Sequence, residues 1–181
     1  MDHLPWQDVS WVIRLDADEY LDPHFQFILL NSRILVNSSF QAISATGAKP
    51  VACEVNPLTL TIDIDDLLRK INSKTKAIMP VHYAGNAGEL DKIYSIAKKY
   101  KLRVIEDAAH AFGSYYKKHK IGHKGDIVCF SFDGIKNITS GEGGCIVSKD
   151  EKVINYIKDA RLLGVHKDSA KRYKNSRSWE L

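Results

Sequence analysis

Short apolar runs alternate with amphipathic helical runs after Pro50, and this rhythm constrains the fold more than any other feature of the chain. The strand-like runs cover residues 51–55, 76–81 and 103–106, and helical runs at 63–71 and 89–100 separate them. Apolar residues occupy both faces of the strands, as in parallel strands that helices cover on both sides. The pattern predicts βαβ crossovers and an α/β fold with a mostly parallel sheet and flanking helices.

Helix caps and later strands extend this pattern toward the C-terminus. Asp63 fits an N-cap of the first helix, with Asp66 three positions later as a capping-box partner. Residues 126–132 and 144–148 are predicted as two further strands, and Asp150 opens a last helix. The glycine-rich turn between these two strands therefore lies at a strand end, where open α/β sheets bind ligands.

Composition and charge are those of an ordinary globular protein. The 181 residues are 44% hydrophobic and 27% charged, which is enough for one sizeable core. The formal charge of +4 is modest and the lysines are spread along the chain, which argues against a nucleic-acid partner. One lysine-rich stretch, residues 117–124, follows two tyrosines and contains Gly122, so we expect a solvated hairpin there.

The cysteines and the N-terminal residues bear on the cellular compartment. Cys53, Cys129 and Cys145 are odd in number and lie far apart in apolar runs, which favours small buried residues over disulfides or zinc ligands. The first residues lack a basic flank, and the apolar run at 25–30 is too short to span a bilayer. We therefore expect a cytoplasmic protein without a membrane partner or a metal site.

Two clusters of reactive residues carry the strongest chemical signal. Residues 106–110 are Glu-Asp-Ala-Ala-His, and residues 131–137 are Ser-Phe-Asp-Gly-Ile-Lys-Asn, followed by a glycine-rich turn. An amine at the end of an apolar strand, here Lys136, can form an imine with an aldehyde cofactor. A carboxylate on a neighbouring strand, here Asp107, can hold that cofactor's ring nitrogen protonated. Together the clusters indicate a pyridoxal phosphate site.

From about Ile34 to Arg177 the chain resembles the DegT/StrS family of nucleotide-sugar aminotransferases, pyridoxal phosphate enzymes of the aspartate aminotransferase fold type I. The resemblance runs through several motifs in the family's order and spacing. Besides the two clusters, they are Ser39-Phe40, Gly47-Ala48-Lys49-Pro50-Val51, Thr75-Lys76-Ala77-Ile78, Pro80-Val81-His82 and Arg161-Leu162-Leu163-Gly164. The resemblance implies part of the large domain of such a transferase.

The resemblance also implies roles for five residues. Lys136 matches the lysine that binds the cofactor, and Asp107 matches the carboxylate at its ring nitrogen. His110 lies where the family has a glutamine or histidine near the cofactor hydroxyl. Ser131 matches a serine that donates to the cofactor phosphate, and Phe40 matches the aromatic residue that stacks on the ring. For the last four, the alternatives are a helix cap, a structural histidine, a local backbone bond and core packing, respectively.

The chain divides into three parts by this resemblance. Residues 31–165 are expected to form a partial large domain, and residues 166–181 a truncated segment that leads to a small domain missing from the chain. Residues 1–30 do not resemble the family and are assigned to an atypical head. Around Asp16 and Asp18 the head resembles the Asp-x-Asp segment of family 2 glycosyltransferases, where carboxylates hold a divalent cation. A solvated acidic turn is the favoured interpretation of this segment.

The expected activity, by resemblance, is transfer of an amino group, usually from glutamate, to a keto group of a nucleotide-linked sugar in polysaccharide or amino-sugar biosynthesis. Pyridoxal 5'-phosphate is the expected cofactor, and a second copy of the chain in a homodimer is the expected partner. Two alternatives stay open. One is an inactive relic or interaction module, because the family's phosphate-binding helix and small domain are not found. The other is a glycosyltransferase-like fragment that uses Asp16 and Asp18.

Overall fold

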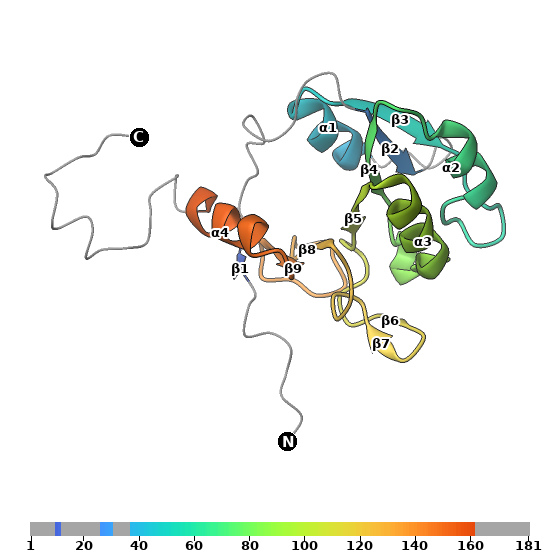
Figure 1. Ribbon diagram of the computed structural model, residues 1–181. Coiled ribbons are helices and arrows are strands. Elements are labelled where there is room, and N and C mark those ends of the chain that lie inside the picture. Colours follow the sequence, from blue (N-terminus) through green and yellow to red (C-terminus); the bar gives the residue numbers. More distant parts are fainter. Residues whose placement is uncertain (1–9, 12–25, 31–36, 162–181) are drawn as a thin grey trace, which may run out of the picture.

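The computed structural model describes residues 10–11, 26–30 and 37–161 (Figure 1). The elements in chain order are β1 (Ser10–Trp11), β2 (Gln26–Leu30), α1 (Asn37–Ala45), β3 (Lys49–Cys53), α2 (Ile64–Lys70), β4 (Thr75–Met79), the 3-10 turn η1 (Tyr83–Gly85), α3 (Leu90–Tyr100), β5 (Arg103–Asp107), β6 (Tyr115–Tyr116), β7 (His119–Lys120), β8 (Ile127–Ser131), β9 (Gly144–Ser148) and α4 (Glu151–Ala160).

Within these residues seven strands form one sheet in the order β1-β9-β8-β5-β4-β2-β3 (Figure 1). Neighbours from β8 to β3 pair in parallel, whereas β9 pairs antiparallel with both β8 and β1. The predicted α/β fold with a mostly parallel sheet is confirmed. Strand bounds differ slightly from the expected ones, since β3 begins two residues before the predicted 51–55 run.

Strand β2 comes from residues 1–30, which were assigned to the head because they do not resemble the family. It lies between β4 and β3 and pairs in parallel with both, with Ile28 opposite Val51 on one side and Ile78 on the other. Its pairing partners are more than twenty residues away in sequence. Local periodicity carries no information on such distant pairing, which explains why the strand was not predicted.

Helix α2 begins at the aspartate that the sequence predicts. The Asp63 side chain accepts a hydrogen bond from the Asp66 amide at 2.8 Å, which makes Asp63 the N-cap. The capping-box role of Asp66 is wrong, because its carboxylate accepts from the Glu54 amide at 2.8 Å and from Arg69 at 3.0 Å. Asp66 is buried and thereby ties α2 to the residue that follows β3.

The core lies between the sheet and helices α2 and α3. Leu67 of α2 and Ile93 of α3 are buried together with Ile78, Val104 and Val128 of the central strands. Burial of each such side chain contributes about 1.5–3 kcal/mol. The helical run at 89–100 was expected to bury Leu90, Ile93, Ile96 and Ala97, and in α3 all of these are buried except Ile96, which is half-buried. This core holds the central strands in register, so the residues at their ends have fixed positions.

An ion-pair cluster joins elements at the amino end of β5. The guanidinium group of Arg103 donates two hydrogen bonds to Asp126, at 2.7 and 2.6 Å, and a third to Asp150 at 3.1 Å. Asp150 is also the N-cap of α4, as the sequence predicts, and accepts from the Lys152 amide. The cluster thus links β5, the start of β8 and the start of α4.

Two smaller expectations are also met. Strands β6 and β7 form an antiparallel hairpin in the lysine-rich stretch. Cys53 and Cys145 are buried free thiols, and Cys129 is a half-buried free thiol.

None of the helices in the described part of the chain is both long and apolar enough to cross a membrane.

Candidate active site

The carboxyl ends of β4, β5 and β8 lie next to one another at one edge of the sheet. Asp107, the last residue of β5, pairs with Cys129 of β8, so Ser131 at the end of β8 lies two residues beyond it on the adjacent strand. Val81, just after β4, forms a bridge to Asp107 from the other side. The two predicted reactive clusters therefore begin at the same edge of the sheet.

Asp107 is held firmly at this edge. Its backbone amide donates to the Pro80 carbonyl at 2.8 Å, and its carbonyl accepts from the His82 amide at 2.9 Å. Its carboxylate accepts from the Ser39 hydroxyl at 2.5 Å and from the Ala109 amide at 3.1 Å. These two hydrogen bonds fix the orientation of the carboxylate. The side chain is half-buried, so part of it stays accessible to a ligand.

Ser39 is a site residue that the sequence analysis did not assign. It belongs to the first half of α1 and is buried, with 3% of its surface exposed. It lies in the Ser39-Phe40 motif, but the expected role went to Phe40. The signal that could have identified it is a small hydroxyl residue next to the aromatic one in that motif. Because the Ser39 hydroxyl donates to the Asp107 carboxylate, Ser39 fixes the orientation of that carboxylate.

Phe40 takes part in core packing, which is the alternative to cofactor stacking considered from the sequence. Phe40 belongs to α1, is half-buried and packs against the small cluster of Ile43, Ala48 and Ala77. Stacking on a cofactor would use its remaining exposed surface and stays a prediction.

Lys136 lies in the turn that follows β8. Its backbone amide donates to the Asp133 carbonyl at 3.0 Å, and the next residue, Asn137, donates from its side chain to the Phe112 carbonyl at 2.9 Å. The turn returns to β9 through Gly144, where a Cβ atom would lie 2.6 Å from the Phe130 carbonyl oxygen. Only glycine fits this close approach, which explains part of the glycine-rich run.

The amine of Lys136 lies next to His110. Its Nζ is 3.5 Å from Nε2 of the imidazole ring. His110 is exposed and its ring contacts the edge of Tyr83, with 6.3 Å between centroids. His110 is three residues after Asp107, so the short segment 107–110 leads from the Asp107 carboxylate to the imidazole beside Lys136. The structure thus brings His110 and Lys136 together beside the edge that Asp107 occupies.

Ser131 is half-buried at the same edge. Its hydroxyl oxygen accepts from the Asp133 amide at 3.4 Å, which is the local backbone bond considered from the sequence. Such a bond uses one lone pair and leaves the hydroxyl hydrogen available to an outside acceptor. The phosphate role of Ser131 therefore stays a prediction. Asp16 and Asp18, the residues of the glycosyltransferase alternative, lie outside the described residues.

A buried polar network lies directly behind the site. Nε2 of His82 is 2.7 Å from Oε2 of Glu106, and the Tyr94 hydroxyl donates to Oε1 of Glu106 at 2.6 Å. The Asp126 amide donates in turn to the Tyr94 oxygen at 2.9 Å. Burial, followed by the Glu106 charge, raises the pKa of Tyr94, so it remains a phenol that can donate. Nδ1 of His82 has no hydrogen-bond partner among the described residues, which favours the tautomer with hydrogen on Nε2.

This chain belongs to the DegT/DnrJ/EryC1/StrS aminotransferase family, whose sequence pattern matches residues 34–178. Enzymes of this family depend on pyridoxal phosphate. Among curated proteins, MJ1066 of Methanocaldococcus jannaschii, an uncharacterized protein, is 48% identical over 132 residues, 73% of this chain and 34% of that protein. The spore coat polysaccharide biosynthesis protein SpsC of Bacillus subtilis is 37% identical over 83% of this chain and 39% of its own length.

Solved structures agree with this assignment. PseC from Helicobacter pylori, an aminotransferase involved in the biosynthesis of pseudoaminic acid, is 31% identical over 84% of this chain and 41% of its own, with a TM-score of 0.76. NtdA from Bacillus subtilis, solved with bound cofactor PMP, is 31% identical over 77% of this chain and 31% of its own, with a TM-score of 0.70. The chain thus spans between 31% and 41% of the length of these proteins.

Proposed function

We propose that this chain carries the pyridoxal 5'-phosphate site of a sugar aminotransferase. The single observation that supports the proposal most is the placement of an anchored carboxylate, Asp107, and an amine with an imidazole neighbour, Lys136, at one edge of the sheet. A small heteroaromatic aldehyde needs both groups. The family of the chain adds to this support.

The residues at the edge fit the chemical groups of the cofactor. Asp107, oriented by Ser39, would face the ring nitrogen and keep it protonated, because a fixed anion favours the charged form of its partner. Lys136 would hold the cofactor through Nζ and, when released, move a proton at the same atom. When bound, the cofactor supplies a sink for the electron pair left by removal of an α proton.

His110 and Ser131 have supporting roles in this proposal. His110 has Nε2 3.5 Å from the amine and would share or relay its proton. Ser131 would donate its hydroxyl hydrogen to the cofactor phosphate, as a small donor at a strand end can. The Phe40 ring would contact one face of the cofactor ring with the part of its surface that is not packed against Ile43, Ala48 and Ala77.

The substrates and the assembly are part of the same proposal. We infer a keto-sugar linked to a nucleotide as the amino acceptor and glutamate as the amino donor, in polysaccharide or amino-sugar biosynthesis in the cytoplasm. Similarity to SpsC and PseC, whose names refer to polysaccharide and pseudoaminic acid biosynthesis, supports the sugar class. A homodimer, in which a second copy completes the site, is the proposed assembly.

Cofactor trapping tests the proposal on the chain itself. The purified protein is incubated with pyridoxal phosphate, reduced with borohydride and digested, and the modified peptide is identified by mass spectrometry. We expect one stable adduct, at Lys136, and an absorbance band that a Lys136→Ala variant loses. Lys152→Ala, which removes an exposed lysine of α4, is the matched control and should keep both signals.

Two outcomes would contradict the proposal. Adducts spread over many lysines, with no loss in the Lys136→Ala variant, would indicate unspecific surface reaction. A folded chain that forms no adduct would support the inactive relic or interaction module instead. Circular dichroism of both variants separates these outcomes from a failure to fold.

A further inference from the structure

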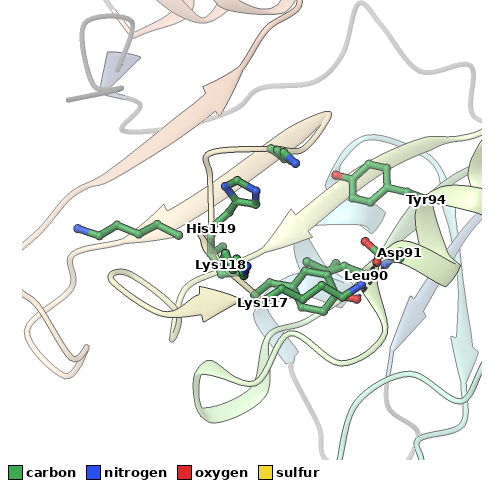
Figure 2. A pocket seen from close by; sticks show the side chains of 10 residues that line it. Leu90, Asp91, Tyr94, Lys117, Lys118 and His119 are labelled. Atoms are coloured by element: carbon green, nitrogen blue, oxygen red, sulfur yellow. Dashed lines mark hydrogen bonds and ion pairs between the residues drawn. The ribbon is translucent and has the colours of Figure 1, made fainter. Parts of the chain in front are cut away.

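A cavity, called here the hairpin cavity, lies between the first turns of α3 and the β6–β7 hairpin (Figure 2). Its volume is about 420 Å³, within the range of ligand pockets. Its lining comes from residues 90–94 on one side and from the hairpin and the residues after it on the other. It shares no residue with the edge that holds Asp107, His110 and Lys136, so the aminotransferase proposal leaves it unexplained.

Positive charge dominates the lining of this cavity. Four lysines, Lys117, Lys118, Lys120 and Lys124, contribute to it, against the single carboxylate of Asp91. Lys117 forms an ion pair with Asp91, so the carboxylate is already compensated. Lys118, Lys120 and Lys124 have no further carboxylate among the described lining residues, and Nζ of Lys120 lies over the Tyr115 ring, 6.0 Å from its centroid. The first turn of α3 adds the positive end of a helix dipole to the same cavity.

Two stacked imidazoles lie on the hairpin side. The rings of His119, which lines the cavity, and His123 are parallel within 8°, with centroids 4.8 Å apart. Desolvation, Lys124 and His123 together lower the pKa of His119, in that order of importance. The second contribution to this shift is that of a cation beside the ring, which a bound anion would oppose.

The wall that carries the lysines is anchored to the protein body. The Ile121 amide donates to the Ser114 carbonyl at 2.9 Å, and Ile121 itself is buried. Gly122 lies against the Phe130 ring, 3.2 Å from where its Cβ would be, so this turn packs on β8. Across the cavity the Asp91 amide donates to the Tyr116 hydroxyl at 3.3 Å, which joins the hairpin to α3. The cations are thus held in a pinned hairpin rather than in a free loop.

We propose that this cavity binds the diphosphate group of a small molecule. Several ammonium groups around one cavity suit an anion with many acceptor oxygens, because each lysine is a point charge with three donors. A single carboxylate ligand would leave most of these donors unused. Leu90, Ile121 and the Tyr116 ring provide an apolar wall, against which the organic part of a diphosphate ester could pack.

Calorimetric titration of the full chain with pyrophosphate, without pyridoxal phosphate, tests this site independently of the proposed function. We expect saturable binding that a Lys118→Gln/Lys120→Gln variant weakens by at least about tenfold, because two charge-assisted contacts are lost. Lys149→Gln/Lys152→Gln, which removes the same charge from exposed positions before and in α4, should bind within about twofold of the original chain. In the original chain the NMR-measured pKa of His119 should rise on binding.

A second titration, with uridine diphosphate, distinguishes a nucleotide ligand from free diphosphate. Tighter binding of uridine diphosphate than of pyrophosphate would indicate a nucleotide ligand that uses the apolar wall, and equal binding would indicate free diphosphate. The proposal would be overturned if both double variants weakened pyrophosphate binding equally. It would also be overturned if sulfate bound as tightly as pyrophosphate at equal ionic strength, because either result would indicate an effect of general surface charge. Absence of saturable binding at millimolar pyrophosphate would overturn it as well.

Discussion

The two consecutive carboxylates at the end of β5, Glu106 and Asp107, have opposite surroundings. Glu106 is fully buried, and both of its oxygens are bonded, one to His82 and one to Tyr94. Asp107 is half-buried and accepts from Ser39 and from one backbone amide. Successive side chains of a strand point to opposite faces, which explains how neighbours in sequence differ so much.

The difference separates a structural group from a group available for chemistry. A buried carboxylate whose oxygens are bonded within the protein has no surface to offer a ligand, and its loss leaves partners unpaired. A half-exposed carboxylate held in one orientation can pair with a cofactor at little cost. Glu106 therefore stabilises the edge of the sheet, whereas the Asp107 carboxylate at the same edge stays accessible to a ligand.

The largest effect on stability is expected from Glu106→Ala. The substitution leaves buried His82 and half-buried Tyr94 without their shared partner, and each polar group left unpaired costs roughly 1–3 kcal/mol. Urea denaturation followed by circular dichroism measures the change in the free energy of unfolding. Asp107→Asn is the matched comparison and should cost about 1 kcal/mol or less, because the Ser39 hydroxyl can still donate to the amide oxygen. Similar losses for both variants would break the distinction between the two carboxylates.

The charge of Asp107 is expected to control the reactivity of Cys129. Desolvation and then the Asp107 carboxylate raise the pKa of Cys129 to about 12. Asp107→Asn removes the negative charge, so the pKa of Cys129 falls and the thiolate fraction at a given pH rises. Alkylation of Cys129 by iodoacetamide near pH 9, measured by peptide mass spectrometry, should therefore become faster.

Cys145 provides the internal control for this experiment. Burial alone raises its pKa to about 11, without a contribution from Asp107. Its alkylation rate should be the same in both proteins. An unchanged ratio of the two rates would mean that Asp107 carries no charge in the folded chain.

A moderate effect on stability is expected at the other end of β5. Arg103 is partly exposed, with 45% of its side chain accessible, although it binds both Asp126 and Asp150. Arg103→Ala should cost about 1 kcal/mol of unfolding free energy, because water screens the pairs. The loss should shrink at high salt in urea denaturation, whereas that of Glu106→Ala should not. A loss as large as that of Glu106→Ala would show that exposure is a poor guide in this strand.

The smallest effect on stability is expected from Asp91→Ala. The ion pair between Asp91 and Lys117 is exposed on both sides, and such pairs contribute little. The urea midpoint should stay within experimental error. Pyrophosphate affinity should increase, because the substitution removes the only carboxylate among the described residues that line the hairpin cavity. A large loss of stability would contradict this expectation, because it would show that the exposed Asp91 contributes as much as the buried groups do.

Much of the fold could be predicted because its signals are local. The N-cap at Asp63 and the buried stripe of α3 follow from residues within one or two turns. The parallel order of β4 and β5 follows from their apolar runs and the helix between them. The capping-box role of Asp66 failed for a non-local reason, since the Glu54 amide competes for its carboxylate.

The candidate site was predicted only in part. The segments around Asp107 and Lys136 are recognisable from their order and spacing along the chain. The Ser39 bond to Asp107 joins residues 68 positions apart, and the Glu106 network joins three separate elements. No local pattern marks a serine in a helix, or a glutamate beside the expected aspartate, as partners of such contacts.

The amino-acid sequence by itself determined the alternation of strands and helices and the hairpin, because periodicity, capping and turn formation depend on neighbours in the chain. The roles of Lys136 and Asp107 stay predictions that rest on the resemblance of their motifs to the family. Tertiary structure decided that β2 fills the place between β4 and β3, that Ser39 reaches Asp107, and that the lysines of the hairpin meet α3. These contacts join distant segments, and only packing of the whole sheet and its helices brings such segments within hydrogen-bonding distance.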